Sequence, residues 1–95
     1  MQPEMRGSIE QYIDFALSDA QMLGYQRYIQ TLKPYVKSIE DAIFGLVVGT
    51  IIASCLDQFI LSYRRPTTPS EMDELQGIVK EKIPKIRSRI LETFV

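Results

Sequence analysis

The chain has 95 residues, of which 45% are hydrophobic and 24% charged, and eleven Lys and Arg against twelve Asp and Glu give a formal net charge of −1. This composition predicts one globular domain and excludes an intrinsically disordered or fibrous chain. The balanced charge argues against a dedicated binder of nucleic acid or anionic membranes. Because the chain has no His and a single Cys, it cannot use His-based acid–base catalysis, a Cys/His zinc site or an internal disulfide.

The first expected helix covers approximately residues 8–32. Ser8 is a good N-cap, and Gln11 three residues later completes a capping box. Apolar residues then recur at spacings of three and four, which indicates one apolar stripe. Gly24 could divide this segment into two helices, and Pro34 ends it because proline disfavours helical geometry at the preceding residue.

The second expected helix covers approximately residues 36–65 and is unusually apolar. Ser38 precedes Glu40 and Asp41, and acidic residues favour the positive end of a helix dipole. Residues 42–56 then contain no charged side chain. Pro66 closes the helix.

The third expected helix covers approximately residues 69–93. Thr68 is the predicted N-cap, Pro69 occupies the first helical position, and Glu71 completes a capping box. Pro84 removes a backbone hydrogen bond and predicts a kink, in one bent helix rather than two separate helices. The apolar stripe comprises Met72, Leu75, Val79, Ile83, Ile86, Ile90 and Phe94. The predicted fold is therefore all-α: one domain over residues 1–95, a three-helix bundle, or four if the first helix breaks at Gly24.

The second helix predicts a partner. A helix that is apolar on every side must be buried on every side, and two amphipathic helices cannot enclose it. An exposed apolar strip usually marks a contact with another protein. We therefore expect a non-enzymatic assembly or adaptor subunit without a cofactor, a homodimer first and a subunit of a larger protein complex second.

Small residues recur every fourth position along this helix, at Gly45, Gly49 and Ala53, so that another backbone could approach closely. The predicted interface consists of Gly45, Val48, Gly49, Ile52, Ala53 and Leu56. The alternative is that the glycines admit a bulky residue of the same chain, and the sequence leaves intrachain and interchain packing equally open.

A single-pass membrane protein is a competing interpretation. The uninterrupted apolar run has fifteen residues, which is shorter than the roughly 20 needed for a span. The N-terminus lacks the pattern of a secretory signal, and Cys55 within an apolar run predicts a buried, unreactive thiol. We therefore expect a cytoplasmic location.

No set of side chains indicates catalysis. Asp57 is the one carboxylate among apolar neighbours, and an ion pair with Arg64 or with a basic group of a partner protein is favoured over a proton-handling role. Tyr25, Arg27 and Tyr28 could stack on bases, although aromatic residues at helical spacing usually belong to a core.

A basic face offers a second competing function, nucleic-acid binding, through Lys80, Lys82, Lys85, Arg87 and Arg89. The same order of charges, acidic at the start of the helix and basic later, is typical of a solvated helix.

Overall fold

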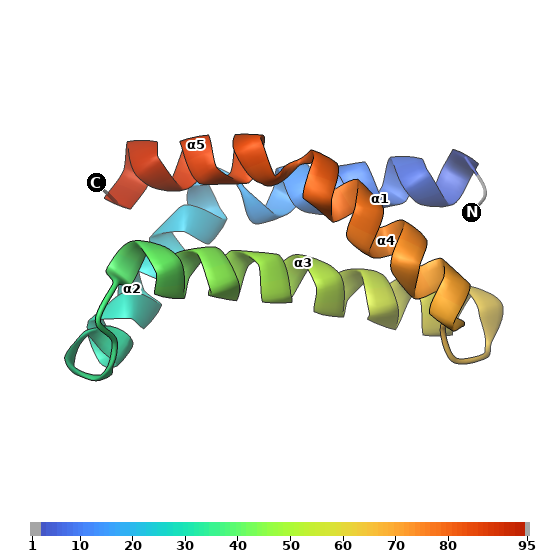
Figure 1. The fold of residues 1–95 in the computed structure, drawn as a ribbon, viewed down its shortest axis with the longest axis horizontal. Helices are drawn as coiled ribbons and strands as arrows, with labels where there is room; N and C mark the ends of the chain where they lie inside the picture. Colours follow the sequence, from blue (N-terminus) through green and yellow to red (C-terminus); the bar gives the residue numbers. More distant parts are fainter. Residues whose placement is uncertain (1–2, 95) are drawn as a thin grey trace.

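The computed structural model describes residues 3–94, and 88% of these residues are helical (Figure 1). The predicted all-α class is confirmed. Over these residues the chain forms five α-helices and one short 3-10 helix rather than the three or four helices expected. They are α1 (Pro3–Ala16), α2 (Asp19–Leu32), η1 (Lys33–Tyr35), α3 (Ile39–Tyr63), α4 (Pro69–Glu81) and α5 (Ile83–Phe94).

The longest helix, α3, is the hub of the fold, since it contacts each of the other four α-helices. Its start agrees with the prediction, because the Ser38 hydroxyl accepts a hydrogen bond from the backbone N–H of Asp41 over 3.2 Å. It ends where Arg64 adopts the left-handed conformation, with φ of 55°. Figure 1 shows α1, α4 and α5 along one side of α3, with α2 at one end.

The expected first helix is two helices, and the break lies at Leu17 and Ser18 rather than at Gly24. Ser8, the predicted N-cap, is inside α1 instead. Ser18 caps α2, and its hydroxyl accepts a hydrogen bond from the backbone N–H of Gln21. Gly24 lies within α2 and is exposed. The break lets Leu17 stay buried while the chain changes direction.

The expected third helix also divides into two, so the predicted single bent helix is wrong. Its start is correct, because Thr68 and Glu71 form the predicted capping box. Lys82 ends α4 with a hydrogen bond from its N–H to the Val79 carbonyl, and its own carbonyl accepts the N–H of Ile86 at the start of α5. Pro84 explains the break, since it has no N–H to continue the ladder of α4.

One core joins the five helices. The stripe predicted from α4 and α5 contributes Leu75, Val79, Ile86 and Ile90, all buried. The core also takes apolar residues of the other helices, including Ile9, Ile13, Met22, Tyr25, Ile29, Val47 and Phe59. The molecule measures 39 × 22 × 21 Å, so α3 extends over most of its length.

Candidate functional site

Residues spaced by four along α3 form rows on the helix surface. One of these rows is buried in the core, and the row on the other side of the helix is exposed to solvent. The buried row consists of Ile43, Val47, Ile51, Cys55 and Phe59. The row on the other side, here called the open row, consists of Asp41, Gly45, Gly49, Ala53, Asp57 and Leu61, and all six residues are exposed. The four helices that contact α3 therefore leave one face of it uncovered.

The predicted interface residues lie on this uncovered face and at its margin. Gly45, Gly49 and Ala53 are exposed in the open row. The other three, Val48, Ile52 and Leu56, are half-buried and pack against the edge of the core. Ile60 continues this margin toward the end of α3 and is 50% exposed, and Leu61 of the open row is 62% exposed.

The two glycines of α3 receive no bulky side chain from the described part of the chain. A Cβ atom added at Gly45 or at Gly49 would meet no atom within 4 Å. The intrachain explanation for these glycines, left open by the sequence, therefore has no contact to support it. Gly77 in α4 is equally open, but it stands alone between the polar residue Gln76 and the core residue Ile78.

Asp57 does not form the ion pair with Arg64, the first of the two partners expected from the sequence. Its side chain is exposed in the open row, and no ion pair links it to Arg64 or to any other residue between 3 and 94. The two residues are seven positions apart, or about 10 Å along a helix, and the left-handed backbone of Arg64 turns the chain away from the axis.

Cys55 behaves as the sequence predicts. Its side chain is 1% exposed within the buried row, and burial raises the pKa of the thiol to about 11. A thiol with such a pKa is almost entirely protonated at neutral pH, so it is a poor nucleophile. Cys55 is therefore a core residue.

The basic face proposed for nucleic acid is largely engaged in ion pairs with other helices. Lys85 Nζ lies 2.7 Å from Asp14 Oδ1 of α1, and Arg89 pairs with Asp19 of α2. Arg87 contacts the first turn of α3, with Nη1 3.1 Å from Glu40 Oε1. Each of these three cations of α5 thus forms an ion pair with a different helix: α1, α2 or α3.

The two remaining members of the basic face lie nearer the junction of α4 and α5. Lys80 is exposed and Lys82 half-buried, and neither has an ion pair with a residue in the described range. Two cations of this kind make a much smaller electrostatic footprint than the five expected from the sequence.

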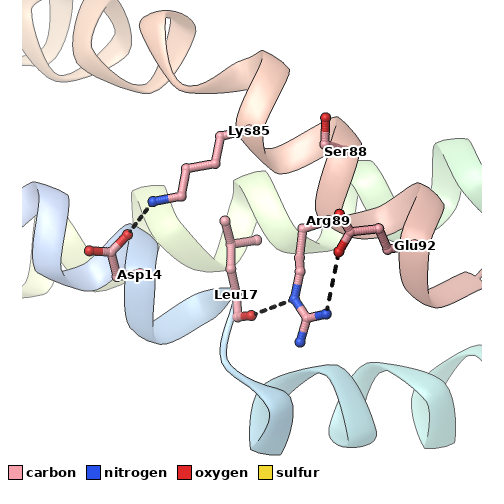
Figure 2. A pocket seen from close by; sticks show the side chains of 6 residues that line it. All are labelled: Asp14, Leu17, Lys85, Ser88, Arg89 and Glu92. Atoms are coloured by element: carbon pink, nitrogen blue, oxygen red, sulfur yellow. Dashed lines mark hydrogen bonds and ion pairs between the residues drawn. The ribbon is translucent and has the colours of Figure 1, made fainter.

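A groove of about 580 Å³ lies between α1 and α5, and Figure 2 shows the side chains that line it. They are Asp14, Leu17, Lys85, Ser88, Arg89 and Glu92. The charged groups in this groove face one another: Lys85 pairs with Asp14, and Arg89 lies 3.9 Å from Glu92. The groove thus lies along the contact between α1 and α5, and the charged side chains that line it form ion pairs with one another.

Two further properties bear on function. By length and composition α3 could cross a membrane, and 28% of its most apolar stretch of 18 residues is buried in the fold. Core helices of soluble proteins can be equally long and equally apolar. Within residues 3–94, no group of three or more His, Cys, Asp or Glu side chains is arranged to hold a metal ion.

Sequence reasoning missed one exposed surface, at the end of α2. Tyr25 is buried as the core interpretation expects, but Tyr28 is 64% exposed and Tyr35, in η1, is 85% exposed. The signal was present in the sequence, since residues 20–39 contain Arg27, Lys33 and Lys37 and no Asp or Glu.

Comparison with known proteins adds no functional assignment: the chain matches no protein-family model, no curated protein and no solved structure.

Proposed function

We propose that this protein is a non-enzymatic assembly subunit whose function is to associate with a second copy of itself through the open row of α3. The observation that carries the proposal is the exposure of Gly45 and Gly49 in the middle of the most apolar helix, with no residue of the described range 3–94 packed on them. Apolar surface of this kind is rare on a soluble monomer unless another molecule covers it.

The glycines themselves support a contact between backbones. Glycine in the interior of a helix costs about 1 kcal/mol relative to alanine, so two of them on α3 weaken the isolated chain. Close approach of a second helix would compensate for this cost, because the absence of a Cβ atom brings more of both helices into van der Waals contact. A second copy of the chain presents the same open row, so the two surfaces can match in shape.

The spacing of four also indicates the geometry of the pair. When rows spaced by four residues on both helices interdigitate, the helices cross at about −40° to −50°. Helices that cross at this angle separate within two or three turns on either side. With Gly49 at the crossing, Asp41 and Asp57 lie about 12 Å away along each helix and keep their hydration.

Gly49→Leu tests this proposal. Light scattering behind size-exclusion chromatography should give twice the chain mass of 10.9 kDa for the original protein and 10.9 kDa for the variant. The variant should still fold, because position 49 is open in the single chain and leucine is a better helix former than glycine.

Gly77→Leu is the matched control, because Gly77 is also an exposed helical glycine with open space around it, but on α4. It should keep the mass of the dimer. A single-chain mass for the original protein over the accessible range of concentrations, or a folded Gly49→Leu variant that still doubles its mass, would contradict self-association through the open row.

Insertion of α3 into a membrane is the second candidate, favoured by the low burial of its most apolar stretch. In that case the chain would precipitate without detergent, and detergent would be needed for any defined mass. A dimer that is soluble in detergent-free buffer contradicts this candidate.

A further inference from the structure

One end of the molecule concentrates positive charge. Residues 20–39 contain three cationic side chains and no acidic one, a local charge of +3, whereas the remaining eight Lys and Arg stand against twelve Asp and Glu, a net charge of −4. These residues form α2 and the turn that leads into α3, at the lower left end of Figure 1. The balanced net charge of the chain therefore conceals a strong asymmetry.

The three cations are not used within the fold. Arg27, Lys33 and Lys37 are exposed, and none forms an ion pair or a side-chain hydrogen bond with a residue in the described range. By contrast Lys85, Arg87 and Arg89 of α5 all pair with carboxylates. Cations free of internal partners remain available for an external anion.

The acidic residues nearest to this segment are largely offset by arginines of α5. Asp19, at the start of α2, pairs with Arg89, and Glu40 and Asp41, at the start of α3, lie 3.1 and 3.7 Å from Arg87. The two arginines offset two of these three negative charges, so the three cations of the segment exceed the one remaining negative charge by two. The field at this end of the molecule stays positive as a result.

Apolar and aromatic groups are exposed among the cations. Tyr28 and Tyr35 are largely exposed, and Leu23, one helical turn before Arg27, is exposed as well. The hydroxyl of a tyrosine stays in water while its ring can enter an apolar layer, which is why tyrosine is enriched at membrane interfaces. We call Leu23, Arg27, Tyr28, Lys33, Tyr35 and Lys37 the basic–aromatic end.

We propose that the basic–aromatic end binds the surface of an anionic phospholipid membrane. Clustered Lys and Arg are attracted to anionic headgroups, and the exposed Tyr28, Tyr35 and Leu23 rest in the interfacial layer between them. A turn at the extremity of the molecule suits a flat lipid surface. Single-stranded nucleic acid is instead bound along a charged groove with stacking platforms. The proposal does not depend on self-association through α3.

Vesicle co-sedimentation tests the proposal, with vesicles of phosphatidylcholine alone and vesicles that also contain phosphatidylserine. We expect binding only to the anionic vesicles, weakened by salt. Each Lys or Arg near such a surface contributes about a fivefold gain in partitioning, so Lys33→Gln with Lys37→Gln should lower binding about 25-fold. Arg64→Gln with Lys80→Gln is the matched control, because it changes the net charge equally at other exposed sites and should leave most of the binding.

Tyr35→Trp supplies an independent readout, because the chain has no other Trp. Its fluorescence should shift to the blue, and become protected from aqueous quenchers, when anionic vesicles are added. Three results would overturn the proposal: no binding to anionic vesicles at low salt, equal loss of binding in the control pair, or binding of single-stranded oligonucleotides but not of vesicles.

Discussion

The Arg89 side chain of α5 holds the corner between α1 and α2, because its Nε donates a hydrogen bond over 2.9 Å to the backbone carbonyl of Leu17. Leu17 follows the last residue of α1, so its carbonyl has no acceptor role within that helix. The same guanidinium pairs with Asp19 at the start of α2. One side chain therefore serves the end of one helix and the beginning of the next.

Arg89→Met should lower the free energy of unfolding by about 1–2 kcal/mol. A hydrogen bond from a charged donor is worth about 1.5–3 kcal/mol, and partial exposure of Arg89 reduces this value. Lys85→Met is the comparison, because the ion pair of Lys85 with Asp14 is exposed and should contribute less than about 0.5 kcal/mol. Urea unfolding measures both, and equal losses in the two variants would show that the Leu17 bond adds nothing.

Glu71 should make the protein sensitive to acid. Hydrogen bonds from Arg65 and from the Thr68 backbone lower the pKa of this carboxyl from 4.5 to about 2. Because the pKa is lower in the folded state, Glu71 stabilises the fold fully above pH 4.5, and this contribution disappears as the pH falls toward about 2.

Urea midpoints of the original protein and of Glu71→Gln, measured across this range of pH, check the effect. The variant should be the less stable protein above pH 4.5, and the two should converge near pH 2. Asp73→Asn, on the same helix but without an ion pair among residues 3–94, is the control and should run parallel to the original protein. A constant difference between Glu71→Gln and the original protein at every pH would contradict the assignment.

Helix starts with local determinants could be predicted from the sequence, but the choice between two equal signals could not. Thr68 with Glu71, and Ser38, cap α4 and α3 as expected, because all the groups involved lie within four residues. The pattern Ser-x-x-Gln occurs at both Ser8 and Ser18, and only Ser18 is a cap. The core decides between them, since Met5, Ile9 and Ile13 continue one buried stripe past Ser8.

The open row of α3 could be predicted from the sequence, but the exposed aromatic surface at the end of α2 could not. That α3 is too apolar to be enclosed follows from composition alone, and its spacing of small residues marks the face that stays exposed. Whether an aromatic residue is core or surface depends on where the helix turns. Tyr25 and Tyr28 lie three residues apart on one helix, yet Tyr25 is buried and Tyr28 is exposed. Only the packing of α2 against α3 separates them.

Cys55 should be inert in the folded protein. Its thiol is buried in the core row of α3, and burial raises its pKa to about 11, so both access and thiolate formation are suppressed. A disulfide-exchange reagent such as Ellman's reagent should react at pH 8 only after urea unfolds the chain. Rapid stoichiometric labelling of the native protein would mean that α3 leaves the core, contrary to the packing described above.

The hydroxyl of Tyr25 is a buried polar group without a hydrogen-bond partner among the described residues. Burial raises the pKa of Tyr25, and the Thr50 hydroxyl close to it partly offsets this rise. The Thr50 hydroxyl donates its own hydrogen to the Leu46 carbonyl over 2.8 Å, and its oxygen is too far from the Tyr25 hydroxyl, or too poorly aligned with it, to form a hydrogen bond by geometry. Removing an unpaired buried hydroxyl relieves a desolvation cost, so Tyr25→Phe should leave the free energy of unfolding unchanged or raise it by up to about 1 kcal/mol.

Tyr12→Phe is the matched control for that substitution, because the Tyr12 hydroxyl donates to Gln58 Oε1 over 3.0 Å. Its removal should cost about 0.5–1.5 kcal/mol, the usual net value of one hydrogen bond. Urea unfolding of the two phenylalanine variants, side by side, distinguishes a paired from an unpaired hydroxyl. If Tyr25→Phe lowers the free energy of unfolding as much as Tyr12→Phe does, then a buried water molecule or Thr50 accepts the hydrogen of the Tyr25 hydroxyl. The contact between α2 and α3 would in that case include a buried hydrogen bond.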